Sequence, residues 1–196
     1  MTPANTDEQD REDMARLNAG HDAALNQLME RHSERLFHYL VRQLNNEADA
    51  ADLAQETFVR IYHHRAAFKP SQRFSTWLFT IATNLIRDRF RWRTRHPEVS
   101  IDAPAEEGAA IQDALPAAGV SPGEQMAAEE RAAAVRQAVE SLPDDLRAAL
   151  ILSEYENLSH AEIGAVLNCS AKAVESRLYR ARAHLRQRLA ELVGTQ

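Results

Sequence analysis

The sequence predicts an all-α protein made of two small helical domains. Helix-forming residues such as Ala, Leu, Glu, Gln and Arg dominate the 196 residues, glycine occurs only 6 times, and runs of β-branched residues are missing. In several segments the apolar residues recur at the three-four spacing of an amphipathic helix. We therefore expect helical domains at residues 20–95 and 131–196.

Residues 96–130 differ in composition from the segments on either side. They hold four of the 7 prolines, three of the 6 glycines and no Lys or Arg. Such a segment cannot bury enough apolar surface to offset the entropy lost on ordering, so we expect an acidic, flexible linker. Residues 1–19 are also polar and acidic, and we expect a disordered tail there.

The charges are segregated along the chain, although the formal net charge is −6. Residues 31–95 hold 12 basic and 6 acidic side chains, whereas residues 96–130 hold 8 acidic side chains alone. The electrostatic footprint of a nucleic-acid-binding protein is local, so this segregation is compatible with DNA binding despite the negative total.

Several classes of protein are disfavoured by what the sequence lacks. The polar N-terminus does not resemble a signal peptide, and no segment is long and apolar enough to span a bilayer. Cys169 is the only cysteine, and no pair of histidines has metal-binding spacing on a helix. Glycine-rich phosphate loops and paired catalytic carboxylates are also missing. We expect a cytoplasmic protein that is not an enzyme and has no cofactor or metal, with Cys169 as a small buried side chain rather than a redox sensor.

The first domain is expected to start with two helices joined by a tight turn. The first covers residues 22–44, Asn45 and Asn46 form the turn, and the second covers residues 47–64. The second helix has an apolar stripe (Ala50, Leu53, Ala54, Phe58 and Ile61) and a polar stripe (Asp52, Gln55 and Glu56).

The segment RDRFRWRTR, residues 87–95, alternates arginines as a strand would, but its context predicts a helix. Pro70 interrupts the loop FKPSQRF, and a third helix starts near Ser75. Apolar positions then continue at helical spacing through the arginine run: Phe74, Trp77, Leu78, Ile81, Leu85 and Trp92. Because residues i and i+2 lie on nearly opposite sides of a helix, the arginines should form two stripes. Arg87, Arg91 and Arg95 form one stripe, which Asn84 joins, and Arg89 and Arg93 form the other.

The second domain has the pattern of a helix-turn-helix. After a helix at residues 126–140, the run Ser-Leu-Pro-Asp-Asp at 141–145 signals a new helix start. Ser159 and Glu162 form a capping box for a short helix that ends near Leu167, where Asn168 suits a left-handed turn. A longer basic helix follows from about residue 171.

The last helix has one apolar face and one polar face. The apolar face consists of Val174, Leu178, Ala181, Leu185 and Leu189. In a helix-turn-helix, the start of the second helix meets base edges, and flanking basic residues neutralise phosphates. We expect Ser176, Tyr179 and Arg180 to contact bases, and Lys172, Arg182 and Arg186 to contact the DNA backbone. A solvated basic face on a helical hairpin is the alternative.

Three segments together resemble the extracytoplasmic-function sigma factors of the sigma-70 family. They are DLAQETFVRIYHH, RFSTWLFTIATNLIRDRFR and SLPDDLRAALILSEYENLSHAEIGAVLNCSAKAVESRLYRARAHLRQRL, which look like regions 2.2, 2.3–2.4 and 4. The resemblance covers about residues 20–95 and 130–192. It implies that the chain binds core RNA polymerase and promoter DNA and is controlled by an anti-sigma factor.

The resemblance also implies which residues do this. Region 2.2 docks on the clamp coiled coil of the polymerase β′ subunit, and the matching positions are Asp52, Gln55, Glu56 and Phe58. Region 2 recognises the minus-ten element as a single strand with a flipped base, and the matching positions are Phe68, Lys69, Asn84, Arg87 and, on the same strip, Arg91. We interpret Trp77 as a core residue rather than a DNA contact.

Region 4 of the family binds the minus-thirty-five element as duplex DNA and touches the β flap. The matching base-contacting positions are Glu175, Ser176, Tyr179 and Arg180. Glu175 departs from relatives with a basic residue there, so it either accepts a hydrogen bond from a cytosine amino group or repels phosphate.

The sequence therefore predicts an alternative sigma factor that directs core RNA polymerase to specific promoters and starts strand opening. The acidic linker could then mimic single-stranded nucleic acid in the polymerase channel. The competing interpretation is a conventional helix-turn-helix regulator that binds duplex operator DNA as a homodimer, although the sequence offers no clear heptad segment for dimerisation.

Overall fold

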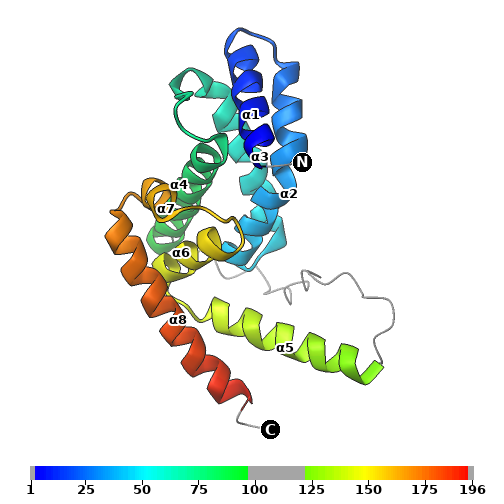
Figure 1. Ribbon diagram of the computed structural model, residues 1–196, viewed down its shortest axis with the longest axis vertical. Coiled ribbons are helices and arrows are strands. Elements are labelled where there is room, and N and C mark those ends of the chain that lie inside the picture. Colours follow the sequence, from blue (N-terminus) through cyan, green and yellow to red (C-terminus); the bar gives the residue numbers. More distant parts are fainter. Residues whose placement is uncertain (1–2, 97–121, 194–196) are drawn as a thin grey trace.

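The computed structural model describes residues 3–96 and 122–193 (Figure 1). Within these ranges the chain forms eight α-helices and one short 3-10 helix, with no strand, which confirms the all-α prediction. The helices are α1 (Pro3–Asn18), α2 (Ala23–Leu44), α3 (Glu47–His63), η1 (Arg65–Ala67), α4 (Phe74–Arg95), α5 (Pro122–Glu140), α6 (Asp144–Glu154), α7 (His160–Leu167) and α8 (Ala171–Val193). None of the helices in this described part is long and apolar enough to cross a membrane.

The N-terminal segment corrects one expectation, because most of the predicted disordered tail is the ordered helix α1. Met14 and Leu17 are buried in the core. Asp10 accepts hydrogen bonds from Arg31 Nε at 2.9 Å and lies 2.8 Å from His32 Nε2. At least one of the acidic side chains that suggested disorder, Asp10, thus interacts with α2 instead of lying free in solvent.

The first domain continues as α2, α3 and α4, joined as the sequence predicts. Asn45 ends α2 in the left-handed conformation (φ 50°), and the Asn46 side chain caps α3 by accepting from the Asp49 backbone N–H at 2.8 Å. In the core, the Tyr39 and Phe79 rings meet edge to face at 5.0 Å between centroids. The Tyr39 hydroxyl lies 2.7 Å from the Thr83 hydroxyl, and burial raises the Tyr39 pKa to about 12.

The linker prediction is wrong at its C-terminal end. Helix α5 begins at Pro122, so residues 122–130 are helical, and α5 starts four residues earlier than expected. Residues 97–121, the rest of the predicted linker, lie outside the described residues. The first turns of α5 project away from the body, and its last turns pack against α8 (Figure 1).

The helix-turn-helix forms as predicted by α7 and α8. The Ser159 and Glu162 capping box starts α7, and Asn168 ends it in the left-handed conformation (φ 54°). Gly164 is required by the turn, because a Cβ atom there would lie 2.6 Å from the Cys169 carbonyl oxygen. Cys169 is half-buried against the core, and its Sγ accepts a hydrogen bond from Arg177.

The two predicted domains pack against each other. Helix α7 contacts α4, and α6 contacts α2, so that apolar residues of both domains share one core (Figure 1). Ile151, Ile163 and Val166 of the second domain belong to this core together with Tyr39 and Phe79 of the first. The sequence predicts the two domains but not this contact between them.

Candidate DNA and polymerase interfaces

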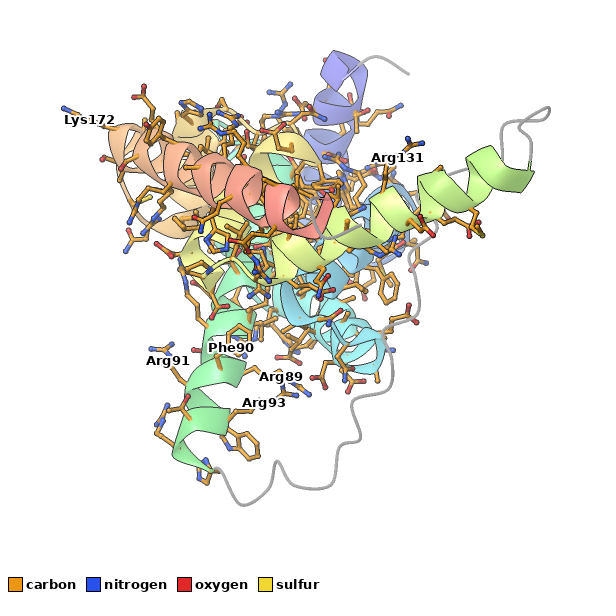
Figure 2. All side chains as sticks on the ribbon, turned by 90° about the horizontal axis from the view of Figure 1, so that it is seen from below. Arg89, Phe90, Arg91, Arg93, Arg131 and Lys172 are labelled. Carbon is orange, nitrogen blue, oxygen red and sulfur yellow. The ribbon has the colours of Figure 1, made fainter. Side chains whose placement is uncertain are left out.

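The arginine run of α4 divides into two stripes with different partners. The Arg89 and Arg93 guanidinium groups both form ion pairs with the Asp49 carboxylate of α3. Arg91 lies on the other side of the helix and pairs with Asp88 on α4 itself (Figure 2). One stripe therefore ties α4 to α3, and the other has no ion pair with α3.

The polar strip of α4 is partly covered by α7. Asn84 and Arg91 are exposed, whereas Arg87 is half-buried. Arg87 donates a hydrogen bond from Nη2 to the Leu167 carbonyl oxygen at 3.1 Å, and its Nη1 lies 3.5 Å from Asn84 Oδ1. The predicted minus-ten contacts are thus brought together, but one of them is engaged by the second domain.

The loop before α4 holds an aromatic cluster. Phe68 is half-buried, with its ring centroid 5.3 Å from that of Trp77 and 6.2 Å from that of Phe74. Trp77 is half-buried within this cluster, in agreement with the packing interpretation, and Lys69 is exposed. Phe68 therefore packs within the aromatic cluster, and the neighbouring Lys69 is exposed to solvent.

Trp92 does not lie in the core, contrary to the helical-spacing prediction. Its side chain is 48% exposed and stacks on His96, with 4.9 Å between ring centroids and 24° between ring planes. The end of α4 projects beyond the neighbouring helices (Figure 2), so the apolar stripe has nothing to pack against there. Trp92 directly follows exposed Arg91 in the sequence, and exposed Arg95 comes three residues later, so the exposed indole is a further candidate DNA contact.

The predicted polymerase contacts on α3 are only partly accessible. Asp52 and Gln55 are exposed, and half-buried Glu56 accepts from Arg60 Nε at 2.8 Å. Phe58 is only 4% exposed and belongs to the core, so its assignment as a surface contact is wrong.

Val59 is the residue on α3 that the sequence reasoning missed. It is 48% exposed and lies one turn beyond Gln55 on the same face. The sequence could have placed Val59 on this face, because Asp52, Gln55 and Val59 stand at the three-four spacing of one helix face.

The outer face of α8 is exposed as predicted. Lys172, Glu175, Ser176, Tyr179 and Arg180 are all exposed, and the Tyr179 side chain reaches 70%. Arg182 and Arg186 are exposed, and Arg182 donates to Glu154 at 2.8 Å. The opposite face is buried through Val174, Leu178 and Ala181.

A cavity of about 530 Å³ lies between the two domains. The first domain lines it with Tyr39, Gln43, Asn84, Arg87 and Arg91, and the second with Asp144, Asp145, Leu167 and Arg177, among others. Arg177 Nε lies 3.3 Å from Asp145 Oδ2. The carboxylates of Asp144 and Asp145 in the second domain thus line the same cavity as Arg87 and Arg91 of the first domain. The resemblance assigns these two arginines to the DNA contact.

Comparisons with known proteins match this arrangement. The family model for sigma-70 region 2 matches residues 28–96, and the model for sigma-70 region 4 matches residues 132–185. The chain is 33% identical over 175 residues to the ECF RNA polymerase sigma factor SigW of Bacillus subtilis, covering 88% of this chain and 92% of SigW. It is 34% identical over 178 residues to the RNA polymerase sigma-H factor of Pseudomonas aeruginosa, covering 90% of this chain and 92% of that relative.

Solved structures agree over nearly the whole chain. CnrH in complex with the cytosolic domain of CnrY aligns with a TM-score of 0.68 and 30% identity, covering 93% of this chain and 98% of CnrH. The sigma factor RpoE in complex with the anti-sigma factor NepR from Bartonella quintana aligns with a TM-score of 0.62 and 25% identity, covering 86% and 96%. The chain therefore belongs to the sigma-70 family, within its extracytoplasmic-function group of alternative RNA polymerase sigma factors.

Proposed function

We propose that this sigma factor recruits core RNA polymerase to a subset of promoters and starts strand opening, with no chemistry of its own. The observation that carries the proposal is the presence of two polar helix faces on different domains, one partly covered by α7 and one exposed. One is the α4 strip of Asn84, Arg87 and Arg91, and the other is the α8 face around Tyr179 and Arg180. The protein would act in the cytoplasm, where polymerase and promoters are found.

The α4 face suits an unpaired strand. An extruded base costs a few kcal/mol of lost stacking, which aromatic and polar contacts must offset. The loop with Phe68 and Lys69 would hold that base, and Asn84, Arg87 and Arg91 would contact the strand along α4. We add Trp92 to this set, because an exposed indole among arginines offers a base a stacking surface and the phosphates a positive charge.

The α8 face suits a duplex. Ser176, Tyr179 and Arg180 are exposed near the start of the second helix of the motif, the part that enters a major groove. Lys172, Arg182 and Arg186 flank them and would neutralise phosphates. Glu175 lies among them and would accept from a cytosine amino group, which sets a preference at one base pair.

The polymerase surface would be the exposed face of α3. Asp52, Gln55 and Val59 supply its accessible side chains, with Glu56 at the edge. Phe58 would support this face from the core. We propose the clamp coiled coil of the β′ subunit as its partner, and the β flap as the partner of the second domain.

An anti-sigma protein is proposed as a further partner. RpoE of Bartonella quintana, a structural neighbour, was solved in complex with the anti-sigma factor NepR. A protein of that kind would compete for the α3 and α4 surfaces. No observation favours the alternative of a homodimeric operator-binding regulator, which would leave the first domain without a role.

The proposal is tested by transcription with the purified chain. Core RNA polymerase, the chain and a library of promoter sequences should yield transcripts from a defined subset. Thymines near the start site should then react with permanganate, which reports unpaired bases. Failure of the chain to associate with core polymerase, or transcripts without dependence on the chain, would overturn the proposal.

A further inference from the structure

Helix α1 is tied to α2 by a buried carboxylate that belongs to none of the DNA or polymerase surfaces described above. Asp10 is 1% exposed, and its Oδ1 accepts a hydrogen bond from Arg31 Nε at 2.9 Å. Its Oδ2 lies 2.8 Å from Nε2 of His32, which is 2% exposed. Asp13, one turn further along α1, accepts from Arg31 Nη2 at 2.6 Å. Both carboxylates fix α1 on α2, but of these two only Asp10 reaches the His32 ring.

His32 connects this carboxylate to the aromatic cluster of the loop before α4. Its ring centroid lies 4.9 Å from that of Phe74, the first residue of α4. Phe74 is 1% exposed, and its ring centroid lies 6.2 Å from that of Phe68 and 6.3 Å from that of Trp77. Side-chain contacts therefore run without a break from Asp10 on α1 to Phe68, which the proposed function places beside the extruded base.

Helix α1 also contacts both ends of that loop, residues 68–73. It packs against η1, which ends immediately before the loop. At the other end, Arg73 Nε lies 2.9 Å from the Asp7 carboxylate of α1. Within the loop a single backbone hydrogen bond joins two residues, with the Gln72 N–H donating to the Lys69 carbonyl oxygen at 3.0 Å. The conformation of the loop therefore depends on what holds its ends.

The stability of α1 on its own does not require a buried carboxylate. Met14 and Leu17 already bury one side of the helix, with 2% and 0% of their surface exposed. A buried ion pair adds little net stability, because the cost of desolvation offsets the attraction. Its hydrogen bonds are directional, however, and the one at His32 Nε2 restricts rotation of the imidazole ring that packs on Phe74. The Asp10 contact is therefore better suited to fixing a geometry than to holding the helix.

We propose that α1 positions the loop at residues 68–73 for the extruded base, through Asp10 and His32 on one side and through Asp7 on the other. This inference rests on the proposed function, since it concerns the same minus-ten strand. A loop binds an extruded base in proportion to the fraction of molecules in which it already has the right shape. Holding both ends raises that fraction and avoids an ordering cost on binding. The three side chains are positioning residues that do not touch DNA themselves.

The test measures the preference of the polymerase-bound chain for the extruded base. The minus-ten oligonucleotide is a single strand with the minus-ten sequence of the strongest promoter from the library. Its binding to the full-length chain on core polymerase is measured by anisotropy, with the intact strand and with strands that carry one abasic site each. The abasic position that costs the parent the most affinity marks the extruded base. The ratio of the two dissociation constants is the base preference, which should be about tenfold for the parent.

Two carboxylates of α1 supply a matched pair of variants. Asp10→Ala should lower the base preference roughly threefold to fivefold, because the intact strand binds more weakly while the abasic strand binds as it does to the parent. Asp13→Ala is the control, because Asp13 is also a buried carboxylate of α1 but accepts from Arg16 and Arg31 rather than contacting His32. It should keep the base preference of the parent.

Two further variants separate the positioning of the loop from the attachment of α1. His32→Gln keeps a side-chain nitrogen that can reach Asp10 but removes the ring from Phe74, so it should lower the base preference as Asp10→Ala does. Asp7→Asn removes the partner of Arg73 on α1 and leaves the core intact, since both side chains are partly exposed. It should lower the base preference roughly twofold. Asp7→Asn decides the outcome if circular dichroism shows that Asp10→Ala does not fold.

The positioning role would be overturned if Asp10→Ala, His32→Gln and Asp7→Asn all kept the base preference of the parent. It would also be overturned if the intact and abasic strands lost affinity equally, or if Asp13→Ala lost as much preference as Asp10→Ala, because α1 would then be merely structural. A parent that prefers a base at no position, or that does not bind core polymerase, would instead contradict the proposed function.

Discussion

The arginines of α4 show that identical side chains a few residues apart serve different purposes. Arg89 and Arg93 share the Asp49 carboxylate, while Arg87 and Arg91 lie on the proposed DNA face. Helical geometry predicts both stripes from the sequence. It cannot predict Asp49 as the partner, because that contact depends on how α3 packs against α4.

Asp49→Ala should destabilise the fold by about 1–2 kcal/mol, because it leaves two half-buried guanidinium groups without their shared carboxylate. The control is Asp88→Ala, which removes only the exposed partner of Arg91 and should change stability by less than about 0.5 kcal/mol. Urea unfolding followed by circular dichroism measures both. Equal losses in the two variants would show that the Asp49 pairs do not tie α4 to α3.

Trp92 can be examined by fluorescence, because the chain has only 2 tryptophans. In a Trp77→Phe variant, binding of the minus-ten oligonucleotide should quench the remaining emission through stacking on a base. Trp92→Ala should weaken binding of that oligonucleotide by about 1–3 kcal/mol. Unchanged emission and affinity would remove Trp92 from the DNA face.

At the scale of helices, the sequence predicts helices α2 to α8 because their signals are local. Apolar spacing sets the faces, and Asn45, Ser159 and Asn168 mark the ends. Helix α1 was missed because the contacts that order it come from α2, such as the pair of Asp10 and Arg31, which are 21 residues apart. Trp92 was misplaced for a related reason, since spacing gives a direction around a helix but not what covers it. Phe58 is buried as its apolar stripe predicts, and only the resemblance made it a polymerase contact.

The turn of the helix-turn-helix depends on Gly164. Gly164→Ala should cost about 1–3 kcal/mol, because its Cβ would lie 2.6 Å from the Cys169 carbonyl oxygen and force α7 and α8 apart. It should also weaken binding to minus-thirty-five duplex DNA. The neighbouring control Ala165→Ser, on the exposed side of α7, should change stability by less than about 0.5 kcal/mol. Thermal unfolding and duplex binding measure both effects, and a stable Gly164→Ala variant would contradict the close approach.

At the scale of the whole molecule, the two domains could be predicted separately but not their contact. Arg35 and Glu156 are 121 residues apart, and no local pattern links residues so distant in the chain. The packing of the two domains, the cavity between them and the covering of Arg87 therefore emerge only from the structure.

The contact between domains should respond to pH in two opposite ways. The folded pKa of Glu156 lies above its ordinary value, so its contribution to stability is present at low pH and is lost as pH rises through the folded value. The folded pKa of Glu162 lies below its ordinary value, so its contribution is present at neutral pH and is lost on acidification. At neutral pH, Glu156→Gln should leave the melting temperature equal or higher, and Glu162→Gln should lower it. Calorimetry that found equal losses in both would contradict these signs.

The division of labour between the two DNA faces is the central claim, and permanganate footprinting on polymerase-bound promoter DNA tests it most directly. Asn84→Ala should reduce the reactivity of thymines near the start site while upstream duplex protection is retained. Arg180→Ala should cost about 1–3 kcal/mol of upstream binding and relax preference at one base pair, with opening intact once the complex has formed. If the two variants lost opening and upstream protection to the same extent, the assignment of unpaired strand to α4 and duplex to α8 would be contradicted.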